Sequence, residues 1–206
     1  MNFIGIDLEG VLIPEIWVSL SEKTGIEELK LTTKDISDYK ELMNIRIGIL
    51  KKNNINSNLL FKIATDIQPF EGAADFLFGI REKYQVIILS DTFFNLSAPI
   101  FKKLNHPTVF CHKLLVDDNN MVSGMEMCVE EHKKRTINYM NSLNFNTLAI
   151  GDSLNDLGML QVADTGILFR SSETIKNKYN KYFSCDTYAE LTNKIHEIFK
   201  AEKVNK

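Results

Sequence analysis

Two pairs of carboxylates follow short apolar runs that lie far apart in the sequence. Asp7 and Glu9 come after the run at 3–6, and Asp152 and Asp156 come after a second such run. Apolar segments this short are normally strands buried in a parallel sheet, and open α/β folds place their chemistry at the carboxyl edge of that sheet. Four carboxylates at one edge repel each other strongly unless a cation lies among them. Because oxygen ligands suit a hard ion, the pattern predicts a Mg²⁺ site.

A hydroxyl group and a basic pair lie between these two acidic motifs. Ser90 and Asp91 follow a third apolar run, and Lys133 and Lys134 open a segment with helical periodicity. Carboxylates, a hydroxyl group, a lysine and a hard cation are the groups needed for phosphoryl transfer through an aspartyl-phosphate intermediate. Taken singly, each motif has a simpler explanation, such as a helix cap or a solvated surface charge. The four motifs in this order favour the chemical explanation.

This order of motifs resembles the haloacid dehalogenase-like phosphohydrolases, and the resemblance extends over the whole chain. It implies that Asp7 is the nucleophile and that Glu9, where most members have Asp, is the general acid and later the general base. The metal would be held by Asp7, by the main-chain carbonyl of Glu9 and by Asp152. Asp156 would not bind the metal directly. It would contact the metal through a water molecule or support the residues that bind it.

The same resemblance assigns the phosphate-binding groups. Ser90 and the neighbouring main-chain amides would bind phosphate oxygens, and a lysine would neutralise charge in the transition state. Lys133 is preferred to Lys134 because its relation to Ile137 matches the helix of the family.

The first two expected strands are separated by about 80 residues, which are more than a single crossover needs. We therefore expect a helical cap at 14–69, inserted into a catalytic core formed by 1–13 and 70–206. Within the cap, a helix expected over 37–52 carries Arg46 in its apolar stripe.

Two cap residues indicate the kind of substrate. Arg46 is either a structural side chain, snorkelling or paired with an acid, or a clamp for a carboxylate, which the guanidinium fork suits. Glu15 is either a first-turn helix acid after Pro14 or the partner of a substrate ammonium group. An arginine and a glutamate facing a phosphate site describe a phosphorylated amino acid.

Two departures from the common motifs narrow the resemblance. Asp7-x-Glu9 stands where Asp-x-Asp is usual, and Ser90-Asp91-Thr92 stands where Ser-Gly-Gly is usual. Both match the bifunctional phosphoserine phosphatases that also transfer phosphate to homoserine. The resemblance implies Mg²⁺-dependent hydrolysis of O-phospho-L-serine, with transfer to homoserine as a second activity. The substrate-binding residues that it implies are Glu15, Arg46, Ser90, Asp91, Lys133 and Asn155.

Other functions stay open at this point. The substrate can be another small phosphorylated metabolite, and a noncatalytic binding protein can share the fold. A phospho-accepting signalling module also combines acids, Mg²⁺, a hydroxyl residue and a lysine. Such a module would have no cap and no use for Asp152 and Asp156.

Short apolar runs alternate with helical periodicity, so we expect an α/β fold with a Rossmann-like parallel sheet and a small helical cap after the first strand. Strands are expected at 3–6, 86–89, 108–111, 148–150 and 166–169. Helices are expected at 73–83, 95–104, 133–143, 156–163 and 188–200. A hairpin should pair 113–116 with 121–127.

The composition is that of an ordinary globular protein, with 44% hydrophobic and 25% charged residues among 206. A net charge of −3 argues against nucleic acid as a partner, and no apolar run is long enough to predict a membrane span. Three cysteines leave an odd thiol and favour a reducing compartment. We expect a cytoplasmic protein, with a homodimer as one option. The four histidines share no ligand spacing and are expected to be structural or exposed.

Overall fold

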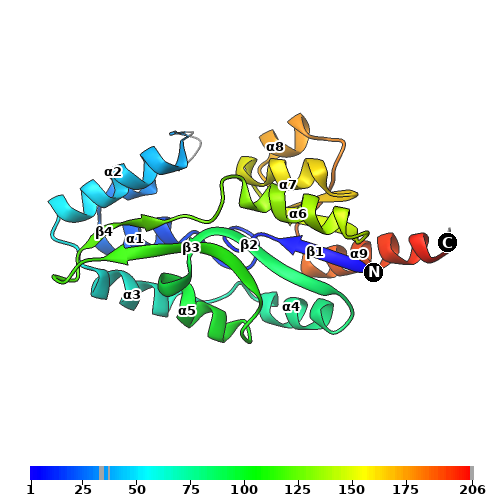
Figure 1. Ribbon diagram of the computed structural model, residues 1–206, viewed down its shortest axis with the longest axis horizontal. Helices are drawn as coiled ribbons and strands as arrows, with labels where there is room; N and C mark the ends of the chain where they lie inside the picture. Colours follow the sequence, from blue (N-terminus) through cyan, green and yellow to red (C-terminus); the bar gives the residue numbers. More distant parts are fainter. Residues whose placement is uncertain (33–34, 37, 205–206) are drawn as a thin grey trace.

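The computed structural model describes residues 1–32, 35–36 and 38–204, and its centre is a seven-stranded sheet (Figure 1). All neighbouring strands pair in parallel except β3 and β4. The strand order is β4-β3-β2-β1-β5-β6-β7. The bounds are β1 Asn2–Ile6, β2 Gln85–Phe93, β3 Val109–Val116, β4 Val122–Glu126, β5 Asn146–Gly151, β6 Thr165–Phe169 and β7 Phe183–Cys185. The predicted α/β class with a Rossmann-like core is confirmed.

Helices cover both faces of the sheet (Figure 1). Those below it in this view are α4 (Ala73–Arg81) and α5 (Phe94–Lys103), and those above it are α6 (His132–Ser142), α7 (Leu157–Val162) and α8 (Glu173–Lys178). The C-terminal helix α9 (Tyr188–Val204) packs against α4. Phe3 of β1 belongs to the apolar cluster under α6 and α7, whereas Ile4 and Ile6 belong to the larger cluster on the other face. A strand buried on both faces must be apolar throughout, which is why β1 is evident in the sequence. None of the described helices is long and apolar enough to cross a membrane.

The segment between β1 and β2 forms α1 (Ile16–Thr24), the 3-10 helix η1 (Glu27–Lys30), α2 (Tyr39–Lys52) and α3 (Ser57–Asp66). The Asp38 carboxylate caps α2 by accepting hydrogen bonds from the main-chain N–H groups of Lys40 and Glu41. α2 contacts η1 and β4, whereas α3 packs against α1 and α5 on the other side of the sheet (Figure 1). The helix expected over 37–52 is therefore present from Tyr39 onward, and Ser37 lies outside the described residues. The proposed cap boundaries, 14–69, stay a prediction.

Two strands are longer than predicted. β2 continues through Ser90 to Phe93, and β3 joins the expected strand at 108–111 to the first arm of the expected hairpin. The pairing of β2 with β3 changes register between Leu89 and Phe93. Irregular pairing of this kind re-aims side chains and is common beside active sites. Here it places Ser90 and Asp91 at the edge of the pocket described next.

Candidate active site

One pocket contains every residue predicted to contact the substrate or the metal directly. It encloses about 110 Å³ and opens where β1, β2 and β5 end, opposite α2. The predicted residues that line it are Asp7, Glu9, Glu15, Arg46, Ser90, Asp91, Lys133, Asp152 and Asn155. The sequence did not single out the other lining residues, which are Trp17, Thr32, Tyr39, Leu42, Ser153 and Leu154. Residues from both halves of the chain thus meet at the predicted edge of the sheet.

The backbone brings the first and last acidic motifs into contact. β1 and β5 are parallel neighbours, and the main-chain N–H of Asp7 donates to the carbonyl of Ile150 at 2.9 Å. Gly10 then turns the chain with a φ of 79°, and a Cβ atom there would lie 2.5 Å from the Asp152 carboxylate. Only glycine combines this backbone angle with so close an approach. The turn therefore holds Asp152 against the loop that carries Asp7.

Three carboxylates crowd together at the base of the pocket. One oxygen from each of Asp7, Asp152 and Asp156 lies within 4.8 Å of the others. Burial and the charge of Asp156 raise the pKa of Asp152 to about 7, and burial with both neighbours raises the pKa of Asp7 well above its usual range. Raised carboxyl pKa values show that negative charge is under-compensated here. Oxygen ligands in such a cluster can hold a metal ion.

Asp156 already has hydrogen-bond donors on both of its oxygens. Oδ2 accepts from the main-chain N–H groups of Asp152 at 3.0 Å and Ser153 at 3.1 Å, and Oδ1 accepts from Lys133 at 2.9 Å. Its side chain is fully buried. Asp7 and Asp152 are therefore better placed than Asp156 to contact a cation directly.

Lys133 is a buried cation at the centre of the site. Its Nζ lies 2.9 Å from Asp7 Oδ1, 2.9 Å from Asp156 Oδ1 and 3.4 Å from Asp91 Oδ2. Burial alone would lower the pKa of Lys133, but these carboxylates raise it well above its usual value. Lys134 instead pairs with Glu131 at 3.1 Å and is not part of this pocket's lining. The position of Lys133 matches the lysine that was preferred from the sequence.

Glu9 has the environment expected of a proton donor. Its Oε2 accepts from the main-chain N–H of Ile16 at 2.8 Å, at the first residue of α1. Burial and the neighbouring Glu15 carboxyl raise the pKa of Glu9 to about 8 despite this hydrogen bond. A carboxylic acid that stays protonated near neutral pH can act as a general acid.

Arg46 is buried, with only 5% of its surface exposed, so it does not snorkel. Nη2 donates to the main-chain carbonyl of Leu31 at 2.6 Å, and the guanidinium carbon lies 4.5 Å from the centre of the Trp17 ring. Nε has no hydrogen-bond partner among the residues that the structure describes. A buried guanidinium with an unused donor beside a pocket is suited to an anion.

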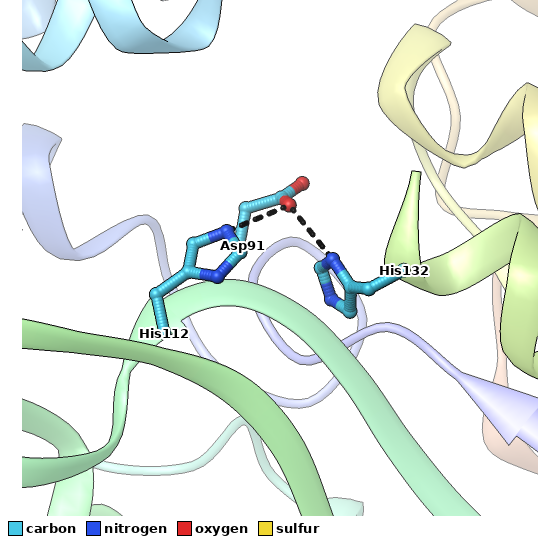
Figure 2. Close-up of side chains that lie close together, drawn as sticks. All are labelled: Asp91, His112 and His132. Atoms are coloured by element: carbon cyan, nitrogen blue, oxygen red, sulfur yellow. Dashed lines mark ion pairs between the residues drawn. The ribbon is translucent and has the colours of Figure 1, made fainter. Parts of the chain in front are cut away.

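Two histidines that the sequence left without a role lie beside Asp91 (Figure 2). Asp91 Oδ1 is 3.5 Å from His112 Nε2 and 3.8 Å from His132 Nδ1. Tyr39 of α2 also donates its hydroxyl proton to the main-chain carbonyl of Asp91. The histidines come from β3 and from the first residue of α6. The single cue in the sequence was that His132 directly precedes Lys133.

Buried carboxylates, a lysine and a hydroxyl group at the carboxyl edge of a parallel sheet are typical of α/β enzymes that transfer phosphoryl groups through a carboxylate. The chain belongs to the haloacid dehalogenase-like hydrolases. A family model of that description matches residues 57–161, and a second one matches residues 131–200. The family predicted from the sequence is therefore confirmed.

Curated relatives match nearly the whole chain. A Pseudomonas aeruginosa protein named phosphoserine phosphatase ThrH is 40% identical over 191 residues, which cover 93% of both chains. A protein of Pseudomonas syringae pv. tomato named phosphoserine phosphatase is 39% identical, covering 90% of this chain and 78% of its own. The chain is thus similar to phosphoserine phosphatases along most of its length.

Solved structures agree on the fold. A phosphoserine phosphatase in apo form has a TM-score of 0.74 and 22% identity, covering 91% of this chain and 94% of its own. A phospho-aspartyl intermediate analogue of phosphoserine phosphatase has a TM-score of 0.74 and 23% identity, covering 90% of this chain and 92% of its own. The α/β core and its insertion therefore have the architecture of these enzymes.

Proposed function

We propose that this protein hydrolyses O-phospho-L-serine to L-serine and phosphate through an aspartyl-phosphate intermediate. The observation that carries the proposal is the pairing, in one pocket, of the Asp7–Lys133 contact with a buried arginine. The first pair suits a phosphoryl group, and Arg46 with Glu15 suits the carboxylate and ammonium groups of an amino acid. The names of the relatives support the same substrate.

In the first step, one oxygen of Asp7 forms a bond to phosphorus while the bond between phosphorus and the seryl oxygen breaks. The protonated Glu9 gives its proton to that oxygen, so serine leaves as a neutral alcohol. In the second step, the Glu9 carboxylate takes a proton from water as the water oxygen bonds to phosphorus. The bond between phosphorus and Asp7 then breaks, and phosphate is released with both acids restored.

Three more of the predicted residues bind and orient the substrate, whereas a direct contact of Asp91 with the substrate stays a prediction of the sequence. Ser90 and Lys133 would contact phosphoryl oxygens, and Asn155 also lines the pocket. Mg²⁺ fits the crowded acids and would be held by Asp7, Asp152 and the main-chain carbonyl of Glu9. When bound, it would neutralise charge on the phosphoryl oxygens. A cytoplasmic location and a homodimer stay predictions.

We also propose transfer of the phosphoryl group to homoserine. After serine leaves, Arg46 and Glu15 still offer sites for a carboxylate and an ammonium group beside the phosphorylated Asp7. Homoserine presents both groups, with its hydroxyl one methylene further out. The longer side chain of Glu9, compared with the usual aspartate, suits that reach.

The test is an assay of phosphate release from phosphoserine with Mg²⁺, with and without homoserine. We expect hydrolysis in both cases, and phosphohomoserine, measured by mass spectrometry, that increases with homoserine concentration. Lys133→Ala should remove turnover, whereas the adjacent Lys134→Ala is the matched control and should keep it. No phosphoserine hydrolysis by the Mg²⁺-loaded protein would refute the function, and inorganic phosphate alone at saturating homoserine would refute the transfer.

A further inference from the structure

Asp91 lies between two sets of hydrogen-bond donors at the irregular end of β2. Its Oδ2 faces the Lys133 ammonium group at 3.4 Å, and its Oδ1 faces two imidazole rings, as Figure 2 shows. The rings belong to His112 at 3.5 Å and His132 at 3.8 Å. Both histidines are more than nine-tenths buried, and both Nε2 atoms lack a hydrogen-bond partner within the described parts of the chain. The arrangement has no place in the two chemical steps above.

The hydrogen bond from Cys128 determines which nitrogen of His112 carries the proton. The main-chain N–H of Cys128 donates to Nδ1 of His112 at 3.1 Å, so Nδ1 must be unprotonated. The ring proton of a neutral His112 is therefore on Nε2, which points at Asp91. This proton also argues against a metal ion at the three side chains, although their ligand atoms lie within 4.8 Å of one another. The Lys133 ammonium group beside Asp91 opposes such an ion further.

His132 offers Asp91 a second donor. Burial lowers the pKa of His132 to about 4, so the ring is neutral near pH 7. A neutral imidazole carries one proton, and Nδ1 is the nitrogen that faces Asp91 Oδ1, while the main chain of Ser90 also interacts with the ring. Both imidazoles lie slightly beyond hydrogen-bond distance. A small movement of the carboxylate away from Lys133 would bring both rings into contact.

Three carboxylates surround the Lys133 ammonium group, which has three N–H donors. Two of the donors form hydrogen bonds, to Asp7 and Asp156 at 2.9 Å, and Asp91 faces the group as an ion pair at 3.4 Å. A phosphoryl oxygen that takes the remaining N–H therefore competes with the charge of Asp91. The contact to Asp91 is the longest of the three, and Asp91 is the one whose side chain remains partly exposed. Asp91 is therefore the carboxylate that a phosphoryl oxygen displaces from Lys133.

We propose that Asp91 is a counter-ion that Lys133 exchanges for the phosphoryl group, and that His112 and His132 are positioning residues that hold the released carboxylate. This inference rests on the phosphoryl chemistry of the proposed function. Without the imidazoles, Asp91 would stay on Lys133 and compete with the phosphoryl group. With them, the negative charge of Asp91 is turned away from the incoming phosphate.

The experiment measures binding of inorganic phosphate by calorimetry, in buffer containing Mg²⁺, together with the kinetics on phosphoserine. His112→Phe keeps the ring shape and removes the donor, and it should raise both the phosphate Kd and the KM about tenfold, as expected for one hydrogen bond to a charged group. Because Lys133 contacts the phosphoryl group in the ground state and the transition state alike, kcat should change by less than about twofold. His112→Gln, whose amide nitrogen can replace Nε2–H, should restore both values. His196→Phe, in α9 beside Tyr84, is the matched control and should change neither.

The decisive comparison is the double variant His112→Phe with Asp91→Asn. An amide cannot compete as an anion for Lys133, so phosphate affinity should return to within about twofold of the Asp91→Asn single variant. If phosphate binding were weakened equally in His112→Phe and in the double variant, His112 would act only through folding. Tightly bound zinc in the purified protein that is lost in His112→Phe would make the cluster a metal site. Either result would overturn the proposal.

A direct readout is nitrogen NMR of labelled histidines, where His112 should show the Nε2–H tautomer. A spectrum of the Nδ1–H tautomer would contradict the proposed donor. Phosphate binding does not depend on turnover, so the two proposals can fail separately. A protein that binds phosphate in this pattern but does not hydrolyse phosphoserine would contradict the proposed substrate alone.

Discussion

The carboxyl groups around Asp7 carry more negative charge than Lys133 can balance. Burial and the charges of Asp156 and Asp152 raise the pKa of Asp7, and Lys133 is shared among its neighbours. Such crowding of charge lowers the stability of the fold. It favours phosphoryl transfer, because this reaction requires a nucleophilic carboxylate oxygen beside a cation. Single substitutions here should therefore separate stability from activity.

Asp7→Asn should abolish turnover of phosphoserine, by at least about 10⁴-fold, because an amide of the same shape cannot attack phosphorus. Thermal stability of the metal-free variant should be retained or rise slightly, since one crowded charge is removed. Kinetics and thermal unfolding on the same preparation test both statements. Activity near that of the wild type would exclude Asp7 as the nucleophile.

Arg46→Ala should lower kcat/KM for phosphoserine. The loss should correspond to about 2–4 kcal/mol of transition-state stabilisation, as for removal of one partner of a buried charge pair. The loss should be much smaller for phosphoethanolamine, which keeps the amine and phosphate but lacks the carboxylate. Steady-state kinetics on the two substrates test this difference. If kcat/KM fell by the same factor for both substrates, Arg46 would instead support the pocket structurally, through its contacts with Leu31 and Trp17.

The motifs predicted nine pocket residues, but the sequence could not reveal contacts that only the fold creates. His112 and His132 come from β3 and α6, and neither shows a ligand spacing with Asp91 along the chain. Trp17 and Tyr39 look like ordinary apolar positions of helices. Both nevertheless face the pocket, Trp17 under the guanidinium and Tyr39 against the main chain of Asp91.

The turn after β1 determines how closely two motifs approach. Gly10 and Gly25 have similar backbone angles, with φ of 79° and 71°, but a Cβ at Gly10 would meet Asp152 and one at Gly25 would meet nothing within 4 Å. Gly25→Ala should therefore lower stability by about 1–2 kcal/mol through the backbone alone and leave activity intact. Gly10→Ala should add a loss of activity and of metal affinity.

Denaturant unfolding and phosphoserine kinetics on the two glycine variants distinguish these effects. Gly25 serves as the control for the backbone angle, so the difference between the variants reports the contact with Asp152. Equal activity in Gly10→Ala and Gly25→Ala would show that Asp152 tolerates displacement.

Element prediction was best where burial dictates residue type. β1 and β5 pack between helices on both faces, so their apolar runs were evident, and α2 showed a clear stripe. The sequence pattern did not predict α8, with six residues, or β7, with three, because elements this short have too few periods to show one. The predicted break within β3 was wrong, because one strand pairs first with β2 and then with β4. A sequence pattern records side-chain burial and not a change of pairing partner.

The acidic cluster should make the stability of the whole molecule depend on pH when metal is removed. The pKa of Asp152 is about 7 in the folded protein, above its ordinary value of 3.8. A raised carboxyl pKa contributes stability at low pH that is lost as pH rises through the folded pKa. In excess chelator, stability should therefore fall between about pH 4 and pH 7 through this group.

Thermal unfolding in chelator and in Mg²⁺ tests that dependence. Saturating Mg²⁺ should restore stability near pH 7.5, by about 2.7 kcal/mol at 100 times its Kd. Asp152→Asn should flatten the pH dependence in chelator and remove most of the Mg²⁺ effect. If neither chelator nor Mg²⁺ changed the unfolding temperature of the wild-type protein at pH 7.5, the result would contradict a cation site among these acids.

The place of β1 in the sheet has a consequence for biosynthesis. β1 lies between β2 and β5, whose pairing residues are 85–88 and 146–150, so the ribosome releases this apolar strand long before its neighbours exist. Unpaired apolar strands in nascent chains are prone to aggregation. Ribosome-bound chains that stop before residue 146 should therefore stay sensitive to protease or held by chaperones. Asp152 is synthesised only after that point, so the acidic cluster around Asp7 is completed late in translation. A product truncated before Asp152 should therefore not cleave phosphate esters.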